Sequence, residues 1–186
     1  MTAFEFHSVT PERLNDLSRF SESHGKFRYC SCMRWRMRST DFQHSITEQR
    51  VAALDAAVQQ NLPVGILAYA NGDPVGWCSV APREMYAALE RYKALPRLDD
   101  QPVWSIVCFF VDSRYRRQGM TLGLLKAAVE YTCSRGAQII EGYPVEADAR
   151  LYQYMGSLAA FKKAGFRDVT PPGKTRRVMR YFVQER

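Results

Sequence analysis

Hydrophobic and polar positions along the chain follow two periods, which separate strand-like from helix-like segments. Short apolar or alternating segments predict strands, whereas apolar residues three or four positions apart predict helices. The predicted strands cover residues 3–9, 64–70, 75–80, 103–112, 138–145, 166–170 and 178–183. The predicted helices cover residues 10–21, 45–60, 82–96, 121–135 and 149–164. This order predicts an α+β fold in which helices flank a mixed, mostly antiparallel sheet of about seven strands.

Several boundaries between these segments carry local signals. Ser45 followed by Glu48 has the spacing of a capping box at a helix start. The turn at 71–73 joins two predicted strands, so we expect a hairpin there. Gly136 and Gly165 each follow a predicted helix, where glycine suits the C-terminal cap.

The composition is that of a globular protein. A length of 186 residues fits one domain over 1–186. Hydrophobic residues at 46% and charged residues at 24% exclude a disordered chain. No apolar run reaches the roughly 18 residues of a membrane span, and residues 1–10 lack the features of a signal peptide. We therefore expect a cytoplasmic protein that does not bind a membrane.

The cysteines indicate neither a disulfide framework nor a metal site. They are Cys30, Cys32, Cys78, Cys108 and Cys133. The count is odd, and three of the five stand in apolar segments, which is typical of a reduced protein. Cys30 and Cys32 form the only close pair, and the three histidines offer no second ligand pair at the spacing of a zinc site.

The net charge of +7 is unevenly distributed. Residues 162–186 hold eight Lys/Arg and two acids, and residues 23–40 hold five Lys/Arg and no acid. Such segregated positive charge attracts nucleic acid, an acidic protein or a phosphorylated cofactor. The alternative is a solvated basic face, and charge alone does not separate these interpretations.

One stretch, residues 107–125, carries a chemical signal. A hydrophobic strand runs into a basic turn that contains Gly119, and the turn runs directly into an amphipathic helix. The first amides of a helix and its dipole favour an anion, and Arg116 and Arg117 add countercharge. The pattern matches neither a nucleotide-triphosphate loop nor G-x-G-x-x-G. The anion that fits this turn best is a pyrophosphate.

The same stretch resembles the GNAT superfamily of acyl-CoA N-acyltransferases, whose motif is Arg/Gln-x-x-Gly-x-Gly/Ala. Arg116 and Gly119 match the first and fourth positions, whereas Thr121 departs from the sixth. Residues 109–115 are similar to the family's strand end and turn, and residues 160–166 to a later helix end. The order of elements fits over nearly the whole chain.

The resemblance implies where acetyl-CoA binds. The fourth and fifth strands should splay, so that the pantetheine arm pairs with the backbone of residues 109–111 while residues 116–121 hold the pyrophosphate. The cofactor-binding residues expected on this basis are Phe109, Phe110, Val111, Arg116, Arg117, Gln118, Gly119, Met120, Thr121, Ser157 and Phe161.

The resemblance leaves the general base open. It implies that the Val111 amide donates to the thioester carbonyl, and that a glutamate on the fourth strand often serves as the base. Residues 103–111 contain no carboxylate, so Glu141 on the next strand is the candidate base. A surface or salt-bridged carboxylate is an equally weighted alternative for Glu141. Asp112 is expected to cap the turn instead.

The general acid is also open. The family's tyrosine falls on Phe161, which has no hydroxyl. Either the thiolate leaves unassisted, which a thiol pKa near 8.5 permits, or another tyrosine serves. Tyr154 stands seven residues earlier on the predicted helix, on the same face, and is the candidate acid. Packing is its alternative role, and Tyr152 and Tyr143 are the fallbacks.

The acceptor side is expected in residues 22–44, an irregular segment dense in aromatic, sulfur and guanidinium groups at 29–36. A helical insertion at about 82–98 departs from the minimal family pattern and should also shape acceptor choice. We expect an N-acetyltransferase acting on a small-molecule or protein amine, without nucleic acid, and leave a homodimer open. The alternative is a non-catalytic acyl-CoA-binding regulatory module that contacts nucleic acid or an acidic partner.

Overall fold

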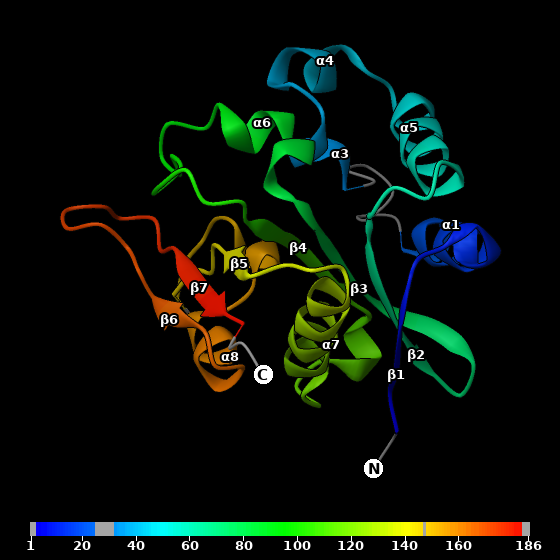
Figure 1. Cartoon of the computed structure of the whole chain (residues 1–186). Helices are drawn as coiled ribbons and strands as arrows, with labels where there is room; N and C mark the ends of the chain where they lie inside the picture. The colour runs from blue at the N-terminus through cyan, green and yellow to red at the C-terminus, as the bar shows by residue number, and fades with distance from the viewer. Residues whose placement is uncertain (1–2, 25–31, 147, 184–186) are drawn as a thin grey trace.

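A seven-stranded sheet organises the computed structural model, which describes residues 3–24, 32–146 and 148–183. The strands are β1 (Glu5–Ser8), β2 (Gly65–Ala70), β3 (Asp73–Pro82), β4 (Trp104–Val111), β5 (Ile139–Gly142), β6 (Arg167–Asp168) and β7 (Met179–Phe182). Their spatial order is β1-β2-β3-β4-β5-β7-β6 (Figure 1). Among the described strands, β4 and β5 pair in parallel and all other neighbours are antiparallel. This confirms the mixed, mostly antiparallel sheet and the hairpin around residues 71–73.

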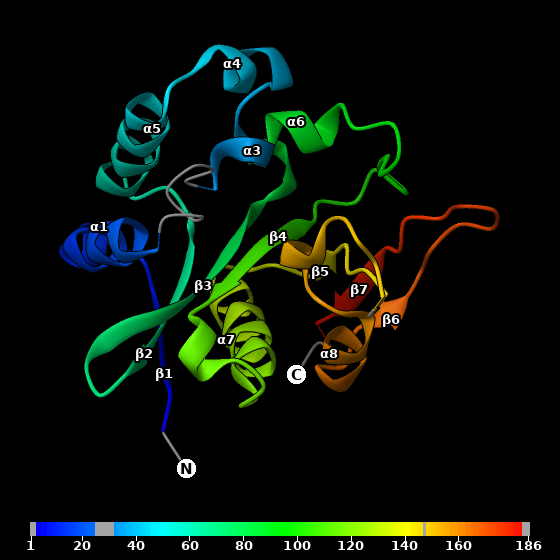
Figure 2. The same cartoon turned by 180° about the vertical axis from the view of Figure 1, so that it is seen from behind.

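Helices cover both faces of the sheet (Figures 1 and 2). Helices α1 (Leu14–Ser23) and α5 (Thr47–Gln59) pack on one face, and α7 (Met120–Ser134) and α8 (Leu158–Lys163) pack on the other. The shorter elements are η1 (Pro11–Arg13), α3 (Met33–Arg36), α4 (Ser39–His44), η2 (Arg83–Met85), α6 (Ala87–Glu90), η3 (Ser113–Tyr115) and η4 (Gln153–Met155). The predicted irregular segment 22–44 therefore contains two short helices, α3 and α4.

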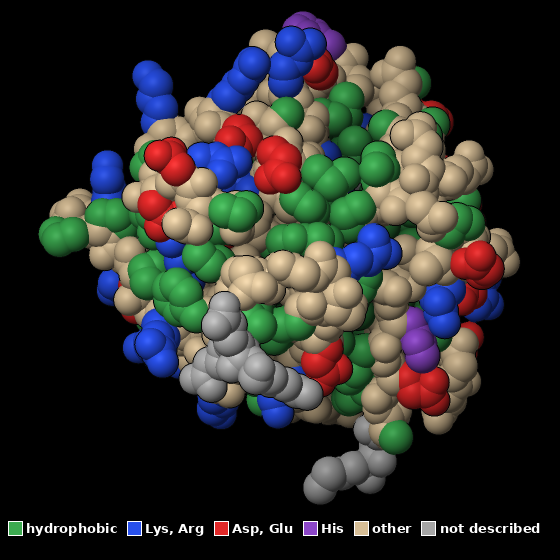
Figure 3. Space-filling view, viewed as in Figure 1, with side chains coloured by type: hydrophobic (Ala, Val, Ile, Leu, Met, Phe, Trp, Pro, Cys, Tyr) green, Lys and Arg blue, Asp and Glu red, His purple; other side chains and the backbone are tan. Residues whose placement is uncertain are grey.

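The predicted helix over 82–96 is wrong, because the insertion is two short turns, η2 and α6. Tyr86 stands between them with φ −110° and ψ 77°, outside the helical region. Arg83 is completely buried, and its Nη2 donates to the Leu95 carbonyl at 2.7 Å, so the segment folds back on itself. On the surface, acidic and basic side chains stand beside one another over α6 and the loop after it, where Glu90 pairs with Arg97 (Figure 3).

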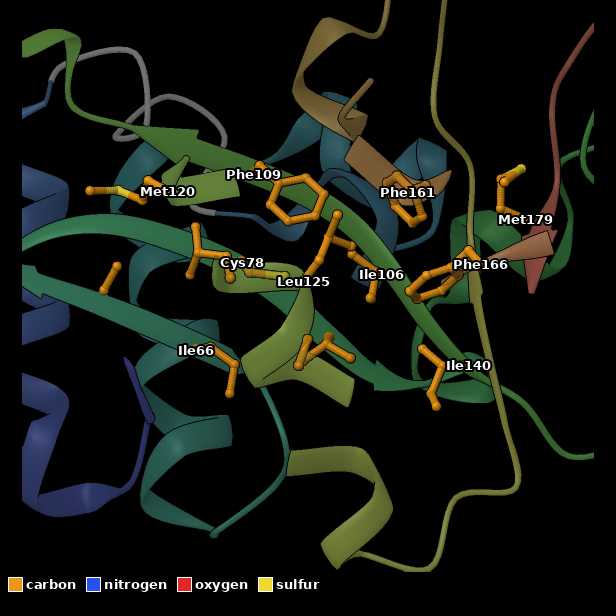
Figure 4. Close-up of a cluster of buried hydrophobic side chains, with 14 of the residues drawn as sticks. Ile66, Cys78, Ile106, Phe109, Met120, Leu125, Ile140, Phe161, Phe166 and Met179 are labelled. Atoms are coloured by element: carbon orange, nitrogen blue, oxygen red, sulfur yellow. The ribbon is translucent and has the colours of Figure 1, made fainter. Parts of the chain in front are cut away.

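The core shows why β2 reads as a continuous apolar run. Ile66 packs with α7 in one cluster, whereas Leu67 packs with α1 and α5 in another. Successive strand residues point to opposite faces, so a strand covered on both sides is apolar at every position. Figure 4 shows the first cluster, in which Leu125 of α7 lies against Ile106 and Phe109 of β4.

Two predicted helix starts also differ from the structure. The N-cap residue of α5 is Ile46 and not Ser45. The Ile46 amide donates a hydrogen bond to Gln49 Oε1 at 3.0 Å. The predicted helix over 149–164 is wrong, because α8 begins at Leu158. Tyr152 at φ 62° and Gly156 at φ 89° both have positive φ, and each interrupts a continuous helix.

Strands β4 and β5 separate where the sheet should open. Their pairing covers Trp104, Ser105 and Ile106, whereas β4 continues to Val111. A register shift against β3 leaves Val107 as an extra residue, a β-bulge that bends β4 at this point. The splay expected between the fourth and fifth strands is therefore present, and it begins at the bulge.

Candidate active site

The turn after β4 is held by Asp112. Its Oδ1 accepts a hydrogen bond from the amide of Arg114 at 2.9 Å, and the Arg114 guanidinium closes on both carboxylate oxygens. These hydrogen bonds hold the pKa of Asp112 well below its usual range. Asp112 therefore caps the turn, as the sequence indicates.

Gly119 forms the N-cap of α7 in a conformation that suits glycine. Its φ is +83°, and a Cβ placed there would meet nothing within 4 Å. The first turn of a helix leaves amides without partners inside the helix, and here those amides follow directly after Gly119. The exposed side chains of Arg116 and Arg117 lie beside them. Open space, unpaired amides and two cations are what a pyrophosphate requires.

The other side chains of the turn have different tasks. Gln118 Nε2 donates to the Arg114 carbonyl at 3.0 Å, which stiffens the turn. Met120 is 2% exposed and packs against Gly76 of β3, so the side chain anchors the helix start while its amide faces the turn. Thr121 is half-buried. Its hydroxyl and γ-methyl group are what the Gly or Ala of the expected motif lacks.

The outer half of β4 offers a free backbone edge. The amide of Asp112 donates to the Val75 carbonyl in β3 at 3.0 Å. Backbone groups alternate between the two edges of a strand, so the amides of Val111 and Phe109 point away from β3, toward the side that β5 has left. Arg116 Nε donates to the Val111 carbonyl on that side at 3.1 Å. Phe110 points its ring toward α1, where it packs on Phe20.

Phe161 closes the floor of the splay between β4 and β5. Its ring is fully buried and lies 6.1 Å from the ring of Phe109 (Figure 4). A Cβ on Gly142 or Gly156 would come within about 3 Å of this ring, so both glycines are needed for the fit. Ser157 caps α8, and its Oγ accepts a hydrogen bond from the Ala160 amide at 3.3 Å. The floor is apolar, and Phe161 offers no proton.

Glu141 lies inside a buried polar network. Its Oε1 accepts hydrogen bonds from Arg83 Nη1 and from the Tyr143 hydroxyl, both at 2.7 Å, and its Oε2 accepts one from Arg180 Nε at 2.8 Å. The side chain is 1% exposed. A general base must reach the proton that it removes, and cations engage both of these oxygens. The geometry supports the salt-bridged alternative for Glu141 and not the base expected from the sequence.

The argument that placed Tyr154 on one helix face with Phe161 is wrong, because Tyr154 belongs to η4 and Phe161 to the separate helix α8. Tyr154 is 38% exposed, and its turn packs on β4. Its role as an acid stays a prediction. The fallback Tyr143 is fully buried, and its hydroxyl contacts Ser105, Glu141 and Arg83.

Sequence reasoning missed two long-range contacts of this region. His24 Nε2, at the end of α1, lies 3.1 Å from Asp112 Oδ2, although 88 residues separate the two along the chain. Arg83 of the insertion and Arg180 of β7 both form ion pairs with Glu141. No local pattern could indicate either contact. The one available signal in the sequence is Arg180, which stands within the apolar segment 178–183.

Cysteines line the α1 side of β4. Cys32 accepts a hydrogen bond from Trp77 Nε1 at 2.8 Å, and its Sγ lies 3.6 Å from that of Cys108 on β4. Burial raises the pKa of the Cys32 thiol. Cys30 lies outside the described residues. Within the described ranges, no group of three or more His, Cys, Asp and Glu side chains could hold a metal ion. The helices described here are all too short or too polar to cross a membrane.

Comparison with known proteins identifies the family. Residues 29–166, well over half of the chain, match the model of the acetyltransferase (GNAT) family. The sequence matches none of the curated proteins compared with it. The fold is similar to the PaiA N-acetyltransferase from Thermoplasma acidophilum in complex with coenzyme A, at 14% identity and a TM-score of 0.55, over 97% of this chain and 99% of that one. It is also similar to yncA from Salmonella typhimurium with acetyl-CoA, at 14% identity and a TM-score of 0.59, over 99% and 96% of the two chains. The chain therefore belongs to the GNAT family of acetyltransferases.

Proposed function

We propose that the protein transfers an acetyl group from acetyl-CoA to a primary amine by direct attack in a ternary complex. The observation that carries this proposal is the continuity of two features: the anion-binding turn at 116–121 and the free edge of β4 at 109–111. A pyrophosphate on the turn and an extended, amide-containing arm along the strand edge are the two halves of CoA. The solved relatives named above were crystallised with CoA or acetyl-CoA, which supports the same cofactor here.

The residues fit this cofactor on physical grounds. The turn supplies the unpaired amides after Gly119, and Arg116 and Arg117 supply charge. The strand edge supplies the Val111 and Phe109 amides to an arm that has its own amide groups. Phe161 and Gly156 form an apolar floor beneath it.

Acetyl-CoA, when bound, supplies an activated thioester carbonyl and a thiol leaving group. The Val111 amide donates a hydrogen bond to the carbonyl oxygen, where negative charge develops. Because both oxygens of Glu141 are engaged, we assign removal of the amine proton to water. We assign protonation of the thiolate to Tyr154, whose turn packs on β4 beside the open edge.

A thiol-release assay with acetyl-CoA and a panel of primary amines tests the proposal. We expect release that depends on both acetyl-CoA and an amine, with mass spectrometry showing the N-acetylated product. Tight CoA binding without acetyl transfer to any amine would contradict the proposal and favour a regulatory acyl-CoA-binding module instead.

A further inference from the structure

Arg176, in the loop between β6 and β7, is partly buried, and its guanidinium group has no anionic partner among the described residues. Its Nε and Nη1 are buried and have no hydrogen-bond partner within the described chain. Its Nη2 contacts the Met155 sulfur at 3.1 Å, and the guanidinium carbon lies 4.1 Å from the centre of the Tyr152 ring. The neighbouring Arg177, by contrast, pairs with carboxylates at Glu146 and Asp168. Burying a charge without a counterion is costly, so this arrangement favours binding of an anion.

A second donor near Arg176 also has no acceptor among the described residues. Trp35 of α3 is 3% exposed, and its indole N–H has no partner in the described chain. Its ring packs edge-on against Tyr92, 5.3 Å away, and the Tyr92 hydroxyl lies 3.0 Å from that of Tyr152. Arg34 adds a second guanidinium, 5.5 Å from the Trp35 ring. Arg and Trp side chains cannot accept hydrogen bonds, and no described acceptor reaches Trp35 Nε1 or the Nε and Nη1 of Arg176, so an anion would supply the missing acceptor.

This cluster of Arg176, Trp35, Tyr92 and Tyr152 adjoins the free half of β4. Met155, which touches Arg176, belongs to the same apolar cluster as Val107, the bulge residue where β4 and β5 separate. The next residue, Gly156, packs on the ring of Phe109. The Arg176 guanidinium therefore lies near the bulge end of the free half of β4, along which we propose that the arm of acetyl-CoA binds. It belongs to segments distinct from the pyrophosphate turn at 116–121.

We propose that this cluster binds an anionic group on the acceptor, so that the protein acetylates primary amines that also carry a carboxylate or a phosphate. The proposal rests on the amine acetyltransfer proposed above. Arg176 forms charge-assisted hydrogen bonds to the anion, the Trp35 indole donates a further one, and the tyrosine rings stack on the body of the acceptor. Arg176 is a specificity residue in this account, and the chemistry takes place on β4.

Matched amine pairs test the proposal. L-phenylalanine carries a carboxylate that 2-phenylethylamine lacks, and O-phosphoethanolamine carries a phosphate that ethanolamine lacks. We expect the anionic member of at least one pair to have the higher kcat/KM by about tenfold or more, as a charge-assisted hydrogen bond provides. The pair that shows the preference identifies the anion.

Two variants assign the effect to Arg176. Arg176→Met should lower the preference ratio within the selective pair by about tenfold or more, whereas Arg177→Met, the matched control, should keep it. Circular dichroism checks folding, and Arg176→Gln replaces Arg176→Met if the latter does not fold. Equal kcat/KM values within both pairs, or an equal loss on both members of a pair in Arg176→Met, would overturn the proposal.

A binding measurement separates this inference from the proposed reaction. With saturating CoA to occupy the pyrophosphate turn, calorimetry follows titration of the protein with benzoate and with inorganic phosphate. We expect one of the two anions to bind the parent protein and the Arg177→Met variant, and not Arg176→Met. This result supports the anion site even if no amine is acetylated, in which case only the proposed reaction fails. Absence of binding by both anions would contradict the anion site.

Discussion

Replacing Glu141 by glutamine distinguishes a structural carboxylate from a catalytic one. The substitution keeps the size of the side chain but removes the charge that Arg83 and Arg180 share. It also replaces one accepting oxygen by an NH2 group that points at cationic donors. Both arginines then stay buried with less compensation, so the main effect should be on stability.

The magnitude follows from the remaining partners. Removing one member of a buried ion pair costs about 3–5 kcal/mol. Arg83 keeps Glu90 and Arg180 keeps Asp99, so we expect the lower end, about 3 kcal/mol. For a chain of this length that corresponds to a fall in Tm of about 6–12 °C. Asp99→Asn is the control, because Asp99 is 42% exposed and its loss should cost at most about 1 kcal/mol.

Urea unfolding followed by circular dichroism measures the stability, and the pH dependence of kcat/KM measures the chemistry. We expect Glu141→Gln to unfold at lower urea with an unchanged slope. Its pH–rate profile, taken well below its Tm, should keep the acidic limb of the parent. A variant as stable as the parent that has lost this limb would refute the reasoning and make Glu141 the general base.

Two further predictions concern proton transfer and acid stability. Tyr154→Phe should lower kcat by about 10²-fold, the lower range for a general acid, and leave the KM for acetyl-CoA nearly unchanged; a raised KM with normal kcat in steady-state assays would instead mean that Tyr154 only lines the cofactor path. The pKa of Asp112 is depressed in the folded state, mainly by its hydrogen bonds to Arg114, so its contribution to stability is present above its unfolded pKa of about 3.9 and is lost as the pH falls below that value. Asp112→Asn should therefore be less stable than the parent at pH 7, and it should lose less stability between pH 5 and pH 3. Urea unfolding at each pH measures this, and an equal fall in the free energy of unfolding of the two proteins between pH 5 and pH 3 would contradict it.

The turn at 116–121, which we propose for the pyrophosphate, was predictable because its determinants are local. Gly119, two arginines and a helix start stand next to one another in the sequence, and the same residues build the turn in space. The strands were predictable for a similar reason, since alternation and apolar runs report which faces are covered. Even the splay follows from the resemblance, although its starting point, the bulge at Val107, does not.

The predictions that failed depend on contacts between distant segments. The apolar spacing over 149–164 predicts a helix, but Tyr152 and Gly156 have positive φ, and the turn η4 between them packs on β4. Glu141 could not be assigned from its own strand, because Arg83 and Arg180 lie 58 and 39 residues away along the chain. The spacing of apolar residues within one helix or strand shows which residues share a face. It does not show which distant segment packs against that face.

Calorimetric titration with CoA of the parent, Gly119→Glu and Gly136→Glu tests the central claim most directly. The two glycines stand at opposite ends of α7, with φ of +83° and +80°, and neither has an atom within 4 Å of an added Cβ. Both substitutions therefore carry the same backbone strain, about 1–2 kcal/mol. Only the one at Gly119 places a carboxylate in the turn proposed for the pyrophosphate. We predict that Gly119→Glu no longer binds CoA while Gly136→Glu binds it like the parent, and unchanged CoA affinity in a folded Gly119→Glu variant would contradict the account.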